Sequence, residues 1–149
     1  MDFLDSQINE FYGPLYMLTQ AGKSLYDDFL IDAKEKGLFH KLSAKNPNAE
    51  WRLWVEGVLV PLNNKIEKII LEKGYLIDEV DLPQCLLDFL IHSAQYKVLI
   101  KKWSFNDFTD FHTKKVYPKE LIDYIKNKYK EKKEKQNDFR EKIFNKKSE

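Results

Sequence analysis

The sequence is poor in the residues and motifs that build disulfide frameworks, redox centres and phosphate sites. Its 149 residues include a single cysteine, Cys85, which excludes an internal disulfide and favours a reducing compartment. It contains no Cys-x-x-Cys pair, no glycine-rich phosphate loop and no Gly-x-Ser-x-Gly nucleophile turn. These absences argue against the common redox, nucleotide-binding and hydrolase classes, and we expect no cofactor.

Long hydrophobic runs are missing as well. Charged residues interrupt every apolar stretch before it reaches the roughly 20 residues that a bilayer-spanning helix needs. The first segment carries Asp2 and Asp5 where an export signal requires basic residues followed by an apolar run. The sequence therefore predicts a soluble protein located in the cytoplasm.

A strong excess of one charge is also absent, because the net charge is only +1. Its distribution is uneven: residues 1–125 hold 15 basic and 19 acidic side chains, whereas residues 126–149 hold 10 basic and 5 acidic ones. An anionic partner would therefore bind at the C-terminus. However, acidic residues alternate with the lysines there, which favours a solvated helix with internal ion pairs over an arm that binds nucleic acid or a membrane.

Helical periodicity dominates the chain, and no segment alternates long enough between apolar and polar residues to predict a strand. Proline interrupts the first two helical segments, at Pro14 and Pro61. We predict an all-α fold of four main helices in a mostly antiparallel bundle. The bundle domain should span residues 1–129. Residues 130–149 should form a charged helical extension of the same domain that runs into solvent.

The second helical segment, residues 51–74, shows two apolar faces. On a helical wheel the main stripe has the members Trp51, Trp54, Val55, Val58, Leu62, Ile66 and Ile69. The opposite, thinner stripe has the members Leu53, Gly57, Val60, Asn64 and Leu71. The third segment, residues 83–103, is apolar nearly all round, which is typical of a helix at the centre of a bundle. The third segment would cover the main stripe of the second segment. The thinner stripe would then be left uncovered, which predicts a contact with a partner.

One candidate site surrounds His92 on the third helical segment. Its helix face also carries Tyr96 and Trp103. A partly buried histidine can titrate near neutral pH, so it could bind a ligand or transfer a proton. A polar line on the second segment, with Arg52, Glu56, Asn63 and Glu67 as members, could complete a pocket. Alternatively, His92 is a core histidine whose hydrogen bonds are satisfied within the protein. The polar line would then be a solvated flank of the helix with ordinary ion pairs.

A metal site is not expected. The three histidines, His40, His92 and His112, fall in three different predicted elements, and the Glu-x-x-His pairs of di-iron bundles are missing. The nearest helical pair is Asp88 with His92.

Two motifs carry a resemblance to a known group of proteins. They are the Phe11-Tyr12-Gly13-Pro14-Leu15 segment and the spacing of tryptophan, glutamate, proline, leucine and asparagine from Trp51 to Asn63. Together with His92 they resemble a family of uncharacterised bacterial all-helical proteins, some with an added N-terminal membrane segment. The resemblance implies an all-helical fold and no assigned activity, and the sequence shows no such added segment.

The sequence thus predicts a non-enzymatic helical bundle that acts through protein contacts, either with a partner protein or as a homo-oligomer. A heptad-like 4-3-4 spacing near the C-terminus, which ends in Phe139 and Ile143, is compatible with a weak coiled-coil contact. The candidate interaction residues are Leu53, Val60, Leu71, Phe139, Ile143 and Phe144. The alternatives are a ligand or catalytic pocket around His92 and a weak anionic-partner surface at the lysine-rich C-terminus.

Overall fold

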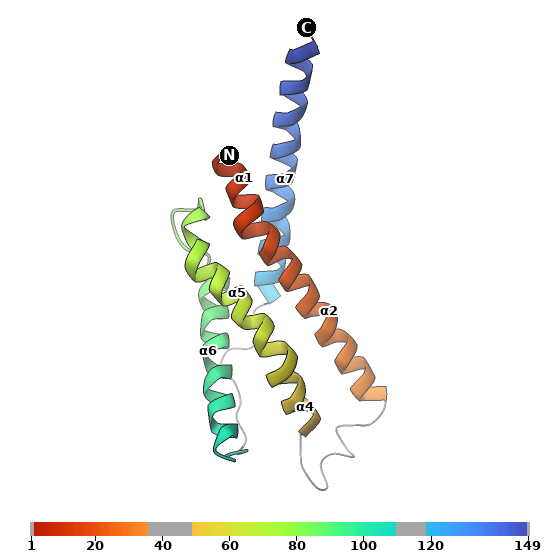
Figure 1. The fold of residues 1–149 in the computed structure, drawn as a ribbon, viewed down its shortest axis with the longest axis vertical. Coiled ribbons are helices and arrows are strands. Elements are labelled where there is room, and N and C mark those ends of the chain that lie inside the picture. The colour runs from red at the N-terminus through yellow and green to blue at the C-terminus, as the bar shows by residue number, and fades with distance from the viewer. Residues whose placement is uncertain (1, 36–48, 110–118, 149) are drawn as a thin grey trace.

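The computed structural model describes residues 2–35, 49–109 and 119–148, and the regular secondary structure of these residues is helical, with no strand among them (Figure 1). The all-α prediction with four main helices is confirmed for this part of the chain. Within the same residues, no helix combines the length and the apolar character needed to cross a membrane.

The first helix runs continuously through Pro14. It consists of α1 (Phe3–Ser6), the π-helical turn η1 (Gln7–Tyr12) and α2 (Gly13–Glu35), which form one rod in Figure 1. The side chain of Asp2 caps its start by accepting a hydrogen bond of 2.9 Å from the backbone N–H of Asp5. The proline therefore does not break the helix as a sequence pattern alone would suggest.

The second helix repeats this construction. It contains α4 (Ala49–Trp54), the π-helical turn η3 (Val55–Leu59) and α5 (Val60–Lys73), and it ends in the 3-10 turn η4 (Gly74–Leu76). In both helices the residue before the proline donates its N–H to the carbonyl five residues back: Gly13 to Ile8, and Val60 to Val55. Proline has no N–H and crowds the preceding turn, so a turn in which the α-type ladder is already open accommodates it.

The π-helical turn changes which residues of the second helix face the core. Val55 and Val60, five positions apart, are both buried, whereas a regular α-helix would turn Val60 away from Val55. Val60 is only 8% exposed, but Leu53 and Leu71 are each 65% exposed. The prediction that Val60 belongs to an outer interaction face is wrong, because the wheel assumed a constant 3.6-residue period through the extra residue of the π turn.

The core lies where the first helix, α5, α6 and α7 meet. Phe11, Tyr12 and Leu15, which flank Gly13-Pro14, are all completely buried. They pack in one cluster with Ile66, Ile70, Leu76, Leu86, Phe89, Leu121 and Ile125. The Phe-Tyr-Gly-Pro-Leu segment is thus the part of the first helix that anchors it to the other three.

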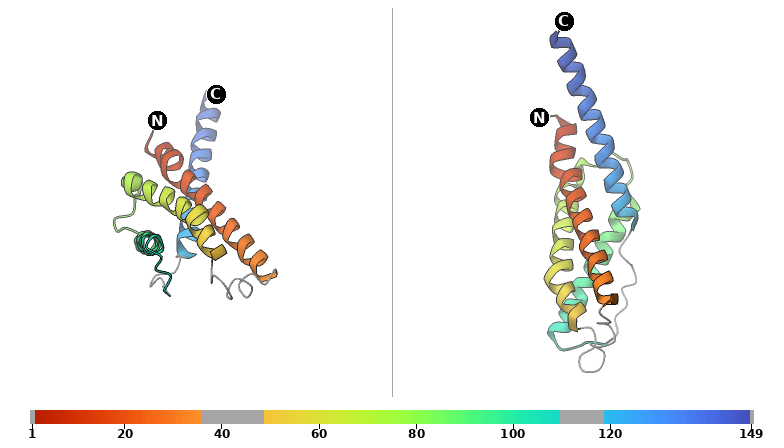
Figure 2. Two further views of the ribbon diagram at one scale, coloured as in Figure 1. Left: turned by 60° about the horizontal axis from the view of Figure 1, so that its bottom comes forward. Right: turned by 90° about the vertical axis from the view of Figure 1, so that its right-hand side faces the viewer.

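The third helix, α6 (Gln84–Ser104), lies at the edge of the bundle. The left view in Figure 2 places α5 between α2 and α6. The inner side of α6 packs against α5 and α7, and its outer side is open. Its buried residues, such as Phe89 and Leu99, face inward, while Leu87, Ile91 and Val98 remain exposed. The prediction that the third helix is central is wrong. The apolar residues on one face of α6 pack in the core, and those on the opposite face are exposed.

The last helix, α7 (Lys119–Ser148), projects beyond the rest of the molecule (Figure 1). Leu121 and Ile125 dock it in the core, and Lys132 and Gln136 are also buried. Every residue from Asn137 to Ser148 is exposed. Contact with the bundle therefore continues past residue 129, through polar side chains, and the projecting part begins after Gln136.

Candidate functional site

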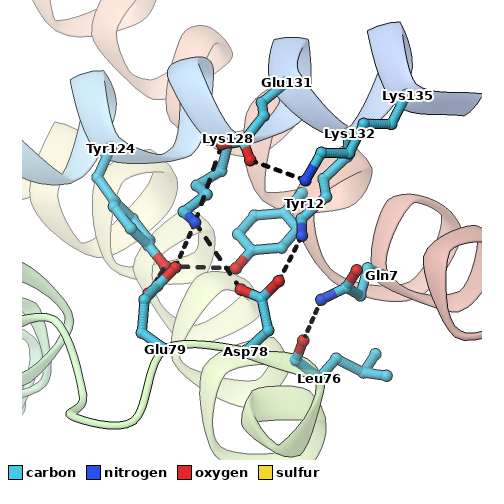
Figure 3. Close-up of polar contacts among 10 residues, drawn as sticks. All are labelled: Gln7, Tyr12, Leu76, Asp78, Glu79, Tyr124, Lys128, Glu131, Lys132 and Lys135. Carbon is cyan, nitrogen blue, oxygen red and sulfur yellow. Dashed lines mark hydrogen bonds and ion pairs between the residues drawn. The ribbon is translucent and has the colours of Figure 1, made fainter.

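A cluster of polar side chains forms where α7 crosses the first helix and the segment after η4 (Figure 3). We call it the α7 polar cluster, and its members are Gln7, Tyr12, Asp78, Glu79, Tyr124, Lys128 and Lys132. Three of these residues, Tyr124, Lys128 and Lys132, follow one another at four-residue spacing and so share one face of α7. Asp78 and Glu79 follow one residue after the short turn that ends the second helix.

The first part of the cluster is a chain of hydrogen bonds. The Tyr124 hydroxyl donates to Glu79 Oε2 at 2.6 Å, and the hydroxyls of Tyr12 and Tyr124 lie 3.3 Å apart. Because Tyr124 uses its single proton for Glu79, Tyr12 is the donor in the bond between the two tyrosines. Lys128 Nζ lies 2.5 Å from Glu79 Oε1 and completes the chain as an ion pair.

The second part is a buried lysine with one carboxylate partner. Lys132 Nζ donates to Asp78 Oδ2 at 2.6 Å, and the lysine side chain is only 3% exposed, while that of Asp78 is 40% exposed. Beside it, Gln7 Nε2 donates to the backbone carbonyl of Leu76 at 2.8 Å. These bonds tie η4 to the first helix, and Asp78 after it to α7.

Burial and these contacts shift several pKa values. Burial raises the pKa of Tyr12 to about 12, against an ordinary value of 10.0. Burial and the hydrogen bond to Glu79 raise the pKa of Tyr124 well above its usual range. The hydrogen bond to Glu79 raises the pKa of Lys128, and the hydrogen bond from Lys132 lowers the pKa of Asp78. At neutral pH both tyrosines are therefore neutral donors, and Lys128 and Asp78 are charged.

We expect the protein to lose stability as the pH rises from 10 towards 12, because only the unfolded chain ionises Tyr12 in that range. The folded-state pKa is raised, so the contribution of Tyr12 is complete below pH 10 and is lost above it. One such tyrosine lowers the free energy of unfolding by about 0.8 kcal/mol at pH 10.5. Urea unfolding near pH 8 and pH 10.5 measures this, and Tyr12→Phe should show a smaller decrease than the wild-type chain. Equal decreases would contradict the assignment.

The α7 polar cluster attaches α7 to the rest of the bundle. Its acidic and basic groups neutralise one another, and its tyrosine hydroxyls are engaged within the cluster. A shallow, open hollow lies elsewhere, on the exposed end of α7 between Arg140, Glu141, Phe144 and Asn145. The cluster holds α7 in place and does not present a reactive group to a substrate.

The structure brings part of the predicted His92 site together. His92 is buried, and its ring centroid lies 4.8 Å from that of Tyr96 one turn later. Tyr96 and Trp103 are half-buried, and burial raises the pKa of Tyr96. The pocket itself stays a prediction, because the described contacts of His92 place it within the packed inner face of α6.

The predicted polar line on the second helix is divided by η3. Arg52, before the π turn, stacks over the ring of Phe108 at 4.2 Å, and Glu56 within the turn is exposed. After the turn, Asn63 is half-buried and Glu67 faces α6, where it accepts bonds from Ser93 at 2.8 Å and Lys97 at 2.7 Å. Glu67 therefore joins two helices and is not part of a common line with Glu56.

Metal ligands converge nowhere in the part of the chain that the structure describes. Of the three histidines considered for a metal, His40 and His112 lie outside the described residues.

Sequence reasoning did not find the α7 polar cluster. The signal was weak: three polar residues at four-residue spacing on the face of α7 that also carries Leu121 and Ile125, and an Asp-Glu pair in a turn. No protein-family model, curated protein or solved structure matches the chain. The resemblance to bacterial helical proteins remains a prediction.

Proposed function

We propose that the protein is a non-enzymatic helical module that acts through protein contacts and associates with itself through the outer face of α6. The observation that supports this most directly is the exposure of Leu87, Ile91 and Val98, which are 37%, 43% and 53% exposed along one line of that helix. Exposed apolar residues in a continuous row, unlike scattered ones, are typical of interaction surfaces.

The candidate interaction residues at the end of α7 form a second apolar surface. Phe139, Ile143 and Phe144 are all exposed on the projecting part of the helix. Lys142, Lys146 and Lys147 flank Ile143 on the wheel, so two copies of this surface would bring like charges together. We therefore assign self-association to α6 and leave the end of α7 as a surface for a different protein.

The other candidate functions have less support. A catalytic role for His92 requires access to its ring, and the side chain is 5% exposed. An anionic partner would bind at the lysine-rich C-terminus. Two of the lysines there, Lys128 and Lys132, already form ion pairs with Glu79 and Asp78. The lysines that remain alternate with acidic residues.

Ile91→Glu is expected to abolish self-association, because it places a charge in the middle of the exposed row. The wild-type chain should show a mass between monomer and dimer that rises with protein concentration, with a dissociation constant in the micromolar range or weaker, since a single helix face makes an interface at the small end of the scale. Sedimentation equilibrium at several concentrations measures this.

The matched control is Val80→Glu, which introduces the same charge at a side chain that is completely exposed in the turn before α6. It should associate as the wild-type chain does, and both variants should keep the wild-type melting temperature. A wild-type chain that stays monomeric at every concentration would rule out the proposed function.

A further inference from the structure

We infer that the self-association surface takes a second copy of this chain in antiparallel orientation, with α6 packed against α6 about a two-fold axis. This inference rests on the proposed function and adds the orientation and the residue pairs. The row on the outer face of α6 is wholly contained in one helix, so a symmetric contact needs no residue from another element.

The spacing along the outer face of α6 is that of a coiled-coil seam. Leu87, Ile91, Ala94 and Val98 are all exposed, and their separations alternate between four and three residues. These are the a and d positions of a heptad, the positions that face a partner helix in knobs-into-holes packing. The buried face of α6, with Leu86 and Phe89, points the other way into the bundle.

Side-chain size distinguishes the two orientations. In an antiparallel pair, a positions face d positions, so Leu87 lies opposite the second copy's Val98 and Ile91 lies opposite the second copy's Ala94. Each layer then combines a larger with a smaller side chain. A parallel pair would place Ala94 against the second copy's Ala94 and leave a void in the middle of the seam, which close-packed interfaces avoid.

Charge favours the same orientation. Lys101 and Lys102 lie at the C-terminal end of α6, whereas the N-terminal end carries Gln84 and Asp88, joined by a hydrogen bond of 3.0 Å. A parallel pair would bring the lysines of both copies to one end, and like charges at that distance repel. An antiparallel pair places the lysine end of each helix beside the other helix's end with Asp88.

A disulfide experiment tests the orientation. In a Cys85→Ser background, the double variant Leu87→Cys with Val98→Cys should form covalent dimers under mild oxidation, because each new thiol faces the other position of the second copy. Within one helix the two positions lie about 16 Å apart, too far for an internal disulfide. The single variant Val98→Cys should give at least about tenfold less covalent dimer, because antiparallel pairing keeps its two thiols equally far apart.

The outcomes separate this inference from the proposed function. Non-reducing electrophoresis shows the covalent dimer, and mass spectrometry of the linked peptides identifies the joined positions. A disulfide in Val98→Cys alone would show parallel pairing and overturn the inference, while self-association would stand. Concentration-dependent dimers without either disulfide would also overturn it, because α6 would then not be the contact. Absence of any association in sedimentation would remove the proposed function as well.

Discussion

Gly13→Ala is expected to lower the free energy of unfolding by about 2–4 kcal/mol, a large effect for the addition of one methyl group. A Cβ atom at this position would lie 2.5 Å from the backbone carbonyl oxygen of Ile8. Real Cβ atoms do not approach a backbone oxygen so closely, and a carbonyl inside a helix cannot move aside as a flexible side chain would. The π-helical turn η1 itself would have to change.

The consequence would extend beyond the glycine, because η1 sets which residues of α1 and η1 face the core. Conversion of η1 to an α-helical turn would rotate everything before Gly13, including the buried Gln7 and Ile8. The Gln7 hydrogen bond to Leu76 and the apolar contact of Ile8 would then both be disturbed. The expected loss therefore combines local strain with lost packing.

Two other glycines provide matched controls. Gly22 lies within α2 and Gly57 within η3, and an added Cβ at either position meets no atom within 4 Å. Since alanine is a better helix former than glycine, Gly22→Ala and Gly57→Ala should raise stability by about 0.5–1 kcal/mol. Urea unfolding followed by circular dichroism measures all three variants. A neutral or stabilising Gly13→Ala would contradict the close approach at Ile8.

Asp78→Ala should lower the free energy of unfolding by about 1–3 kcal/mol, because it leaves the buried ammonium group of Lys132 without its carboxylate. This expected loss of stability is smaller than for a fully buried ion pair, because the side chain of Asp78 is 40% exposed and water reaches it. The pKa of Asp78 is lowered in the folded state, so its contribution is present above the unfolded value near 4 and is lost as the pH falls below it. Unfolding at pH 7 and pH 3 checks both statements.

A second substitution separates the buried charge from the contact itself. Lys132→Met in the Asp78→Ala chain removes the unpaired ammonium and keeps the long apolar stem, so most of the lost stability should return. Lys135→Met is the control, because Lys135 pairs with Glu131 at 3.2 Å on the surface of the same helix and should change stability by less than about 0.5 kcal/mol. A double variant no more stable than Asp78→Ala would show that the pair itself, and not the unpaired charge, is what matters.

The architecture explains why the proposed contact lies on α6. Because α5 lies between α2 and α6, the core is closed by four helices without the outer face of α6 (Figure 2). The α7 polar cluster fixes α7 against the first helix and the residues after η4, and so α7 cannot move to cover that face. An apolar row on a rigid helix at the edge is the arrangement that a second copy could use.

Periodicity, helix-breaking residues and the distribution of charge were enough to predict the all-α class, the four main helices and the exposed end of α7. These features depend on neighbours within a few residues, which a sequence displays directly. The same reasoning placed Leu53 and Leu71 outside, as the structure shows. It failed for Val60, because the extra residue of the π turn rotates Val60 relative to Leu53 on the preceding turn.

The sequence by itself determined the local elements of this protein: where helices form, where proline falls and which segments are charged. Only the tertiary structure decided that both prolines follow a π-helical turn, that α6 lies at the edge, and that a lysine and a glutamine of α7 are buried. The physical reason is that a helix apolar all round, or a polar side chain at an inward position, has no fixed environment until other helices pack against it. Contacts between residues distant along the chain, such as Tyr12 with Tyr124 and Lys132 with Asp78, made those choices.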